Sequence, residues 1–405
     1  MLKLATKLTK KVVLTLAAAS GAYALISYIY NTQFPQSVTF SRNPASRRST
    51  KNLDYLKNKE TIKILIVTGG GVRGLIPLYV LKHIEKHSKK PINEVFDIFT
   101  GVSTGAVIVT GINIPGNAIP NHFGEKISHL DYLINIYKSV TGYLFKSPWY
   151  HIVLTGAGLF SPSYFGKRLH EIMEKYYTKE LNFTDLDNYV IIPALNIESG
   201  EVCLFKNRGE NVYNLPTNSL YQLMTAAASA ETAFPPVAFE EMNANFQSSH
   251  LDIAAPQENI FGSVFADAAI ALNNPASLIL RDIIQDFPDK KYYVLVLCSG
   301  YPRLLSSSMK YHSLRKWGRI HWARDAMANI QRSMDKNQLY MLEVAKIISE
   351  KGRIEYDFLN VDINKPFVGI FDHDLLHHLK NYSNKLIKDN EKSLAKIIKH
   401  LHDLD

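Results

Sequence analysis

Residues 62–74 read IKILIVTGGGVRG, and residues 96–106 read FDIFTGVSTGA. In the first stretch a β-branched apolar run, 62–67, ends in glycines, which predicts a buried strand followed by a tight turn. In the second stretch an expected strand at 95–99 leads through another glycine turn into an expected helix. Two successive units of strand, glycine turn and helix are typical of an α/β layer fold with a mainly parallel sheet.

The rest of the chain continues this alternation. Further strands are expected at 190–196, 202–205, 264–266, 292–298 and 354–361. Helices are expected at 75–87, 106–112, 164–177, 218–229, 275–285, 318–350 and 382–402. Since no internal repeat or low-complexity tract divides the chain, we expect one three-layer α/β/α domain at 61–300, with a helical C-terminal section, 301–405, packed on it.

Composition and charge narrow the class of protein. With 405 residues, 46% of them hydrophobic, the chain can bury a large core, which excludes wholesale disorder. Two cysteines, Cys203 and Cys298, exclude a disulfide scaffold or a multi-cysteine zinc site, and both lie in apolar runs typical of buried thiols. The net charge of +9 is not that of a nucleic-acid binder, because residues 1–60 supply +8 and residues 61–309 sum to −3.

The basic N-terminal section contains a membrane-targeting pattern. Lysines precede an uncharged run, 12–30, whose 19 residues would span about 28 Å as a helix, which is close to the thickness of a bilayer core. We expect residues 1–31 to be an N-terminal hydrophobic helix that anchors the protein in a membrane, and residues 32–60 to be a polar tether. The alternatives are a peripheral or buried helix and a secreted protein after signal cleavage at Ala22-Tyr23-Ala24. The mass of the mature N-terminus distinguishes cleavage from retention.

The glycine turn at Gly69–Gly74 is suited to binding negative charge. Its glycines leave backbone N–H groups free to point outward at the start of a helix. The pattern also satisfies the dinucleotide-binding motif of a nicotinamide oxidoreductase, but that motif requires an acidic residue after the next strand, where this chain has Thr100-Gly101. A phosphate-binding loop is disfavoured as well, since no Gly-Lys-Ser/Thr follows. Arg73 is expected to hold the loop by hydrogen bonds.

The second turn, Gly101-Val102-Ser103-Thr104-Gly105, has the G-x-S-x-G pattern between an expected strand and helix. A serine on such a sharp turn projects its hydroxyl from the sheet, with small neighbours Gly101 and Gly105 relieving the crowding. We therefore expect Ser103 to be a nucleophile rather than an ordinary turn serine. The N–H groups of Gly70, Gly71 and Thr104 would form an oxyanion hole.

The general base is less obvious from the residues. His312, His321 and His373 are candidates for a serine–histidine–acid triad, but none has a recognisable catalytic context. His373, His377 and His378 with Asp372 and Asp374 could form a metal face, although a solvated helix end is the simpler interpretation, and no metal site is expected. Asp267 ends the expected strand at 264–266, and a carboxylate at the carboxyl end of a strand lies where α/β folds place their chemistry.

In this order, the motifs resemble the patatin-like phospholipases over roughly residues 61–300. The resemblance rests on the two glycine turns and Asp267, and on three further segments: Asn196-Ile197-Glu198-Ser199-Gly200 with Phe205, Ala226-Ala227-Ala228-Ser229-Ala230 with Phe234-Pro235-Pro236, and Asn273-Asn274-Pro275. It implies a patatin-like fold and a catalytic Ser103–Asp267 dyad without histidine. It also implies an oxyanion loop supported by Gly69, Arg73 and Gly74.

Such a dyad defines a reaction that requires no cofactor. Ser103 would attack an ester carbonyl, the oxyanion hole would receive the developing charge, and Asp267 would accept the serine proton. An ordinary aspartate is a poor base near neutral pH, so burial should raise its pKa. Ala268 departs from the glycine that the family usually has after the aspartate, and alanine would be strained there if a positive φ were required.

The expected function is hydrolysis of fatty-acyl esters of membrane phospholipids or related acylglycerols. The alternative from another class is a non-catalytic protein of the same fold that binds acyl lipids, which Ala268 motivates. Residues 112–160 are rich in aromatics and would form either a lid or membrane-docking surface or ordinary helix packing. These aromatics are Tyr132, Tyr137, Tyr143, Phe145, Trp149 and Tyr150.

A basic segment at 310–336 carries seven Lys and Arg against two Asp and Glu. Apolar residues recur in it every three or four positions, which predicts an amphipathic helix with an apolar face toward the core. Its basic side could rest on anionic lipid. The expected apolar face comprises Trp317, Ile320, Ala323, Met327, Ile330 and Met334.

Overall fold

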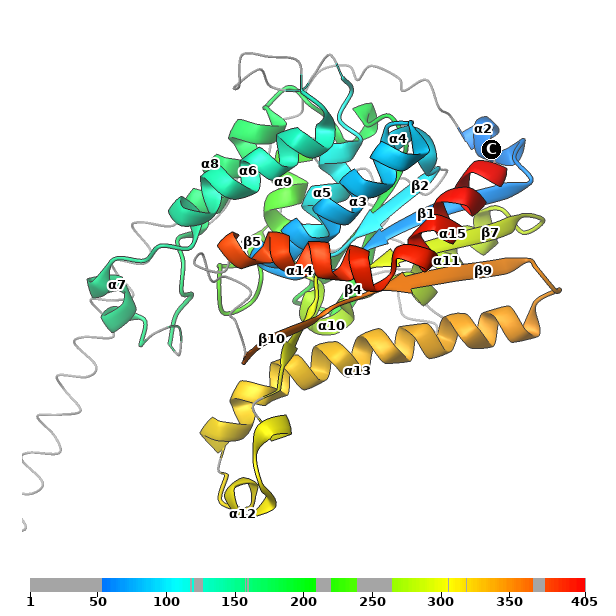
Figure 1. Ribbon diagram of the computed structural model, residues 1–405. Helices are drawn as coiled ribbons and strands as arrows, with labels where there is room; N and C mark the ends of the chain where they lie inside the picture. The colour runs from blue at the N-terminus through cyan, green and yellow to red at the C-terminus, as the bar shows by residue number, and fades with distance from the viewer. Residues whose placement is uncertain are drawn as a thin grey trace, which may run out of the picture.

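The computed structural model describes residues 53–116, 119, 127–156, 158, 160–208, 220–238, 264–304, 306–317, 319–366 and 376–404. An eight-stranded sheet lies at its centre, in the order β5-β6-β3-β2-β1-β7-β9, with β4 paired to β3 (Figure 1). Its strands are β1 (Thr61–Val67), β2 (Ile98–Gly101), β3 (Tyr189–Asn196), β4 (Glu201–Lys206), β5 (Val237–Ala238), β6 (Val264–Asp267), β7 (Lys291–Leu297) and β9 (Ile354–Leu359).

The sheet is mixed, with a parallel centre. The five strands from β3 to β9 in the sheet order are all parallel to their neighbours. Strands β4 and β6 pair antiparallel with β3, and β5 pairs antiparallel with β6. The β3–β4 pair is a hairpin whose turn contains Gly200 at φ 74°. A small second sheet pairs β8 (Tyr301–Arg303) with β10 (Asp362–Pro366).

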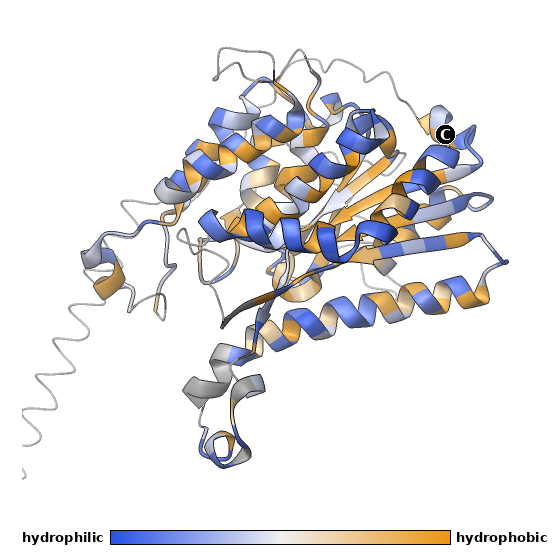
Figure 2. Cartoon of the chain, in the orientation of Figure 1, coloured by the Kyte–Doolittle hydropathy of each residue, from blue (hydrophilic) through white to orange (hydrophobic). Residues whose placement is uncertain are grey.

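Helices cover both faces of the sheet, so the expected three-layer architecture is confirmed. Alternate residues of β1 point to opposite sides: Leu65 and Val67 join one core cluster, and Ile62, Ile64 and Ile66 join the other. Figure 2 shows the strands as the hydrophobic centre between helices with hydrophilic outer faces.

The two layers of helices differ in size. The larger core cluster contains residues of the short helix α4 (Ile92–Val95) and of seven longer helices: α3 (Leu75–Ser88), α5 (Thr104–Ile112), α6 (His129–Leu144), α8 (Gly166–Tyr177), α9 (Leu220–Ala227), α14 (Leu376–Asp389) and α15 (Glu391–Asp403). The opposite cluster contains residues of α2 (Leu53–Lys57), α11 (Ala276–Asp286) and α13 (Arg319–Ile348). Other short helices complete the chain: α7 (Trp149–Leu154), α10 (Ala269–Leu272) and α12 (Tyr311–Leu314).

Two expected elements have different limits. The strand predicted at 95–99 starts only at Ile98, because Val95 ends the helix α4 and the buried Asp97 side chain binds the Lys63 N–H and the Lys59 ammonium. The helix predicted at 382–402 is two helices, α14 and α15, which separate at Asn390, where the backbone leaves the helical region. Both pack on α3.

The aromatic segment at 112–160 contains α6 and α7. Tyr132 and Tyr137 are buried in the core, as helix packing requires. Tyr143, Trp149 and Tyr150 are exposed, so packing does not explain the second half of the segment.

The predicted apolar face of α13 is wrong at the two helix positions that can be compared: Ile330 is 42% exposed, and Met334 is only half-buried. The side chains of Ile320, Ala323 and Met327 lie outside the described part. Among the described residues of α13, those that are buried are Asp325, Ala328, Asp335 and Leu342. The reason is that the N-terminal half of α13 packs on polar loops and strand ends rather than on an apolar sheet face.

The leader lies outside the described residues, so the anchor and the cleaved signal stay predictions. Folded structure already begins within the segment expected to be a tether, where α2 buries Leu56. Among the helices that the structure describes, none combines the length and the apolar character needed to cross a bilayer.

The contact between α5 and β1 leads to a stability prediction. A Cβ on Gly105 would lie 2.0 Å from the carbonyl oxygen of Val67, which is backbone and cannot move aside, whereas nothing lies within 4 Å of a Cβ on Gly116. We expect Gly105→Ala to lower the free energy of unfolding by about 2 kcal/mol or more and Gly116→Ala to leave it nearly unchanged. Urea unfolding measures both, and equal stabilities would contradict the close approach.

Candidate active site

Ser103 occupies the strained turn between β2 and α5. Its backbone lies at φ 56° and ψ −123°, a conformation that residues other than glycine rarely adopt. The turn closes because Gly101 and Gly105 pack backbone to backbone: a Cβ on Gly101 would lie 2.3 Å from the Gly105 carbonyl carbon. The strain lifts Ser103 above the sheet edge and leaves the residue 8% exposed.

Asp267 reaches this turn by a route that the sequence did not indicate. Asp267 ends its strand, as predicted, but β6 is antiparallel to β3. Asp267 pairs with Ala194, which lies three residues beyond Ile191, the partner of Thr100 on the other side of β3. The aspartate therefore lies level with the turn that follows β2, although its strand runs in the opposite direction.

The Asp267 carboxyl is fully buried and only partly satisfied. Its Oδ1 accepts a hydrogen bond of 2.9 Å from the Ala269 N–H, while its Oδ2 is buried without a hydrogen-bond partner. Burial raises the pKa of Asp267 to about 7, against the opposing effects of the Ser103 hydroxyl and the Ala269 N–H. The nearby charge of Glu231 raises this pKa further. The effect of Ser103 is that of a side-chain hydrogen bond to the carboxyl, so the nucleophile and the expected base lie next to each other.

Ala268 adopts an ordinary backbone conformation, at φ −73° and ψ −5°. Alanine is therefore unstrained at this position, and the departure from the usual glycine gives no reason to doubt the placement of Asp267.

The loop at Gly69–Gly74 lies beside Ser103 at the same sheet edge. Neighbouring parallel strands β2, β1 and β7 end there, which brings together the Ser103 turn, this loop and Ser299. Gly69 is close to the nucleophile, since a Cβ on it would lie 3.2 Å from the Ser103 Cβ. Gly70 is pressed against Ser299, whose hydroxyl donates to the carbonyl of Thr68.

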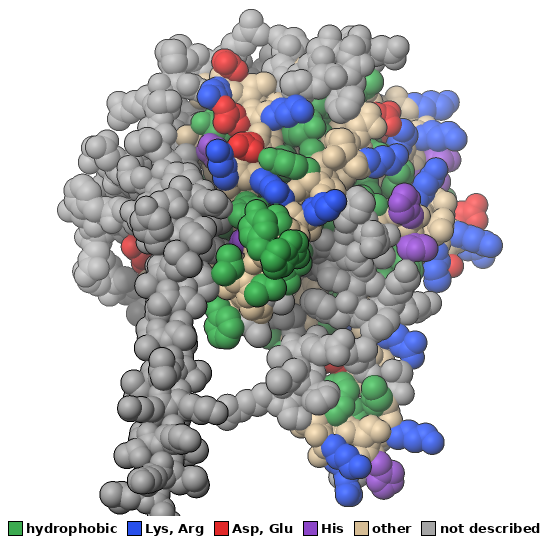
Figure 3. Space-filling model, turned by 90° about the vertical axis from the view of Figure 1, so that its left-hand side faces the viewer, with side chains coloured by type: hydrophobic (Ala, Val, Ile, Leu, Met, Phe, Trp, Pro, Cys, Tyr) green, Lys and Arg blue, Asp and Glu red, His purple; other side chains and the backbone are tan. Residues whose placement is uncertain are grey.

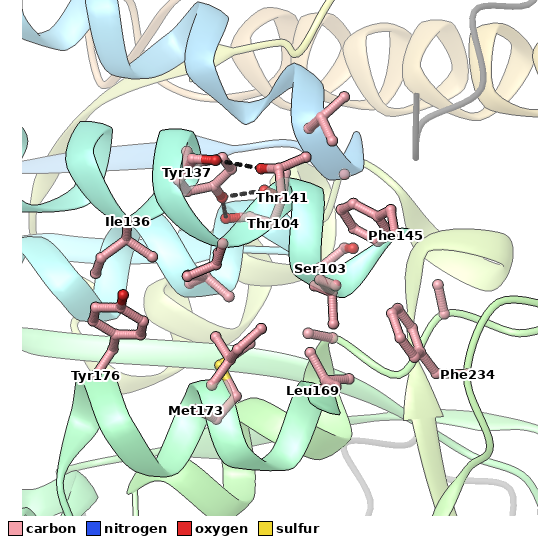
Figure 4. A pocket seen from close by; sticks show the side chains of 18 of the residues that line it. Ser103, Thr104, Ile136, Tyr137, Thr141, Phe145, Leu169, Met173, Tyr176 and Phe234 are labelled. Atoms are coloured by element: carbon pink, nitrogen blue, oxygen red, sulfur yellow. Dashed lines mark hydrogen bonds between the residues drawn. The ribbon is translucent and has the colours of Figure 1, made fainter. Parts of the chain in front are cut away.

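The helical side of the loop packs on α5. Gly71, at φ 55°, starts a 3-10 turn that ends at Gly74, where a Cβ would lie 2.6 Å from Thr104 Oγ1. The Thr104 hydroxyl is hydrogen-bonded to the buried Tyr137 hydroxyl, which also donates to the Thr104 carbonyl (Figure 4). The structure thus gathers Gly70, Gly71 and Thr104 around Ser103, and their role as oxyanion donors stays a prediction.

Arg73 is the buried support of this loop. Its guanidinium donates to the carbonyl of Gly70 at 3.2 Å, to the carbonyl of Gly300 at 2.6 Å and to Gln331 Oε1 at 3.4 Å. Burial lowers the pKa of Arg73 to about 10, and the charge of Asp335 opposes this effect. Arg73 thus connects the loop both to the end of β7 and to α13.

Helix α13 braces the site with polar side chains. Gln331 Nε2 donates to the carbonyl of Gly69 at 3.5 Å, and Asp335 Oδ1 accepts from Asn273 Nδ2 at 3.2 Å. Burial raises the pKa of Asp335 to about 6. These contacts explain why the inner face of this half of α13 is polar.

Ser103 lines two cavities of different character. The first has a volume of about 90 Å³ and is lined by α6 and α8, with Ser103 and Thr104 in its wall between Tyr176 and Phe234 (Figure 4). Its walls are apolar and include Ile136, Val140, Leu144, Phe145, Leu169, Ile172, Met173 and Phe234. Such a slot suits an unbranched hydrocarbon chain.

The second cavity is larger, about 260 Å³, and more polar. Arg73, Glu231, Asp267 and Gln331 line it together with Ser103. Glu231 is half-buried, its Oε2 is buried without a hydrogen-bond partner, and burial raises its pKa. The nucleophile therefore lies between an apolar slot and a larger chamber with buried polar groups, which we call the polar chamber although much of its wall is apolar.

The other sequence candidates lie elsewhere. His312 on α12 and His377 and His378 on α14 are exposed. The side chain of His321 and all of residues 367–375 fall outside the described part of the chain. Within the described part, no cluster of side chains could hold a metal ion. Cys203 and Cys298 are buried thiols, as expected.

Three residues of the site were not predicted from the sequence. Glu231, Gln331 and Asp335 lie in segments predicted as loop or amphipathic helix, and they join the site only through packing. The polar positions between apolar ones in 310–336 were the available hint for the latter two.

Comparisons with known proteins agree with this geometry. The family model described as patatin-like phospholipase matches residues 65–280, which is more than half of the chain. A "cGAMP-activated phospholipase" of Vibrio cholerae is 26% identical over 59% of this chain, which spans 62% of that relative. "Patatin-like protein 1" of Arabidopsis thaliana is 23% identical over 65% of this chain and 64% of its own length. "Patatin group D-3" of Solanum tuberosum is 24% identical over 73% of this chain and 74% of its own length.

The matched span includes both glycine turns and Asp267, the residues that the structure gathers at one sheet edge. This chain belongs to the patatin-like phospholipase family.

Proposed function

We propose that the protein is a serine acyl hydrolase that cleaves fatty-acyl esters of membrane phospholipids. The observation that carries the proposal is the position of Ser103, which faces a buried carboxyl with a raised pKa and lies between an apolar slot and a polar chamber. An ester bond held at Ser103 would place its acyl chain in the slot and its head group in the chamber.

The first half of the reaction acylates the enzyme. Ser103 Oγ attacks the ester carbonyl carbon while its proton passes to Asp267, and the carbonyl oxygen becomes an oxyanion that accepts hydrogen bonds from the Gly70, Gly71 and Thr104 amides. The tetrahedral intermediate then collapses, the bond to the alcohol breaks, and the leaving alkoxide takes the proton from Asp267.

The second half releases the fatty acid. Asp267, again a carboxylate, accepts a proton from water, and the resulting hydroxide attacks the acyl carbon. Collapse of this intermediate breaks the bond to Ser103 Oγ, which recovers its proton from Asp267. Each step uses only side chains and amides of this chain. The raised pKa of Asp267 suits both proton transfers near neutral pH.

Removal of the nucleophile provides the direct test. We expect Ser103→Ala to lower the rate of fatty-acid release from phospholipid vesicles by about three orders of magnitude or more. Ser199→Ala, on the exposed β3–β4 hairpin, should retain the wild-type rate. Mass spectrometry of the lipids measures the products. Undiminished release by Ser103→Ala would refute the mechanism, and an inactive wild type would favour an acyl-lipid-binding protein.

The pKa of Asp267 predicts the pH dependence. Only the deprotonated carboxyl can accept the serine proton, so kcat/KM for a short-chain soluble ester should rise as the pH increases through about 7. Glu231→Gln removes a negative charge that raises this pKa, so the midpoint should move to lower pH. A midpoint that is unchanged, or that moves upward, would contradict the coupling of the two carboxyls.

Asp267 should also cost stability at alkaline pH. The pKa of Asp267 is raised from 3.8 in the unfolded chain to about 7. The stability that comes from burying the neutral carboxyl is therefore fully present below pH 3.8 and is lost as the pH rises through 7. At pH 8 we expect Asp267→Asn to be inactive yet more stable, by at most about 4 kcal/mol. Urea unfolding at pH 8 and pH 4 measures the difference, which should vanish at pH 4.

The exposed Asp403→Asn on α15 is the matched control and should show no such gain. If Asp267→Asn were less stable than the wild type at pH 8, the buried Asp267 carboxylate would be stabilised by its surroundings, and the prediction would be wrong.

A further inference from the structure

Helix α7 and the turn after it expose an unusual group of large apolar side chains, which we call the α7 surface. Trp149, Val153 and Phe160 are 78%, 69% and 81% exposed, and Tyr150 and Ile152 are about half exposed. Trp149, Ile152 and Val153 lie on one helical face by their spacing. Figure 3 shows a hydrophobic group at the centre of this side of the molecule.

The α7 surface is held in its exposed position by contacts at its base. His151 is the only buried residue of α7; its ring packs on Phe165 at 4.3 Å, and its Nε2 lies 3.3 Å from the carbonyl oxygen of Pro162. The Ser147 hydroxyl donates to the carbonyl of Ser163 at 2.6 Å. The helix projects from the body of the fold (Figure 1). These contacts fix α7 where its apolar side chains face outward, and exposed groups of this kind mark binding surfaces.

The segment that contains the α7 surface carries a small positive excess. Residues 131–171 contain four Lys and Arg and two acidic residues, Asp131 and Glu171 at its ends, although residues 61–309 as a whole sum to −3. The four basic residues are Lys138, Lys146, Lys167 and Arg168. Glu171 lies 3.8 Å from the Lys167 ammonium. Figure 3 shows Lys and Arg side chains beside the hydrophobic group. Arg168 also ties the end of α6 to α8 by donating to the carbonyls of Tyr143 and Lys146.

The segment that carries the α7 surface follows the slot closely along the chain. Phe145 and Phe234, which line the slot, pack against Tyr164 at ring distances of 5.3 and 5.7 Å. Phe145 directly follows α6, and α7 begins four residues later.

We propose that the α7 surface docks the protein on a phospholipid bilayer that contains anionic lipid, with Trp149, Val153 and Phe160 inserted at the level of the headgroups and upper acyl chains. Aromatic and aliphatic side chains beside lysine and arginine are the composition of interfacial membrane-binding elements. The proposal rests on the proposed function, because the docked slot would receive the acyl chain of its substrate.

Tryptophan fluorescence tests the insertion directly. The chain has three tryptophans, so the full-length double variant Trp317→Phe, Trp322→Phe leaves Trp149 as the single reporter. Added to vesicles of phosphatidylcholine with phosphatidylglycerol, it should show a blue-shifted emission that is quenched by lipids brominated in the upper acyl chain. Because the readout comes from Trp149 alone, attachment through the leader does not imitate it. An unshifted, unquenched emission would overturn the proposal.

Activity separates docking from chemistry. We expect the variant Trp149→Ser, Val153→Ser, Phe160→Ser to lose about tenfold in the ratio of vesicle hydrolysis to soluble-ester hydrolysis. The matched control is Ile347→Ser, Ile348→Ser on α13, since these residues are 72% and 79% exposed and lie on another element. The control should keep the wild-type ratio, and Ser103→Ala should lose both activities.

Three results would contradict the assignment. An equal loss in the α13 control would mean that apolar exposure in general, not the α7 surface, sets vesicle binding. An unchanged ratio in the α7 variant would exclude docking at this surface. If the wild type were a dimer and the α7 variant a monomer, with an unchanged ratio of vesicle to soluble-ester hydrolysis, the surface would bind a second copy of the chain.

Discussion

The site depends on how closely α5 can approach the sheet. Gly105 packs against the Val67 carbonyl of β1, and Gly101 packs against Gly105, so the chain reverses within the two residues between β2 and α5. This contact forces Ser103 to a positive φ and lifts it above the edge where β2, β1 and β7 end together. The glycine loop, Arg73 and both cavities are positioned relative to that edge. The strained backbone of Ser103 is therefore maintained by the close packing of Gly101 and Gly105, which flank it in the sequence.

Uncompensated burial is the second theme of the site. Asp267 and Asp335 are both buried with raised pKa values and with one carboxylate oxygen lacking a hydrogen-bond partner. Their desolvation is unfavourable for folding at neutral pH. For Asp267 the same desolvation makes the carboxyl basic enough to take a serine proton. The large apolar cores on the two faces of the sheet stabilise a fold that carries this cost.

Helices α13 and α7 invert the usual arrangement of polar and apolar faces. The N-terminal half of α13 turns Gln331 and Asp335 inward because it packs on loops whose carbonyl and amide groups need partners. Helix α7 turns Trp149 and Val153 outward, where no other part of the described chain covers them. Periodicity locates an apolar face but does not tell what that face meets. That is why the prediction for 310–336 chose the wrong side and the prediction for 112–160 remained open between packing and docking.

Local features of the sequence determined the α/β class, both glycine turns, Ser103 and most strands, because strand, turn and helix signals act over a few neighbouring residues. The strand-end position and the family resemblance both pointed to Asp267, whereas the antiparallel direction of β6 was not predicted. Only the tertiary structure decided that Glu231, Gln331 and Asp335 join the site and that Ser103 separates two cavities. Those relations link residues up to 262 positions apart, as in the Gln331–Gly69 contact, and are set by the packing of whole helices and strands, which no short segment encodes.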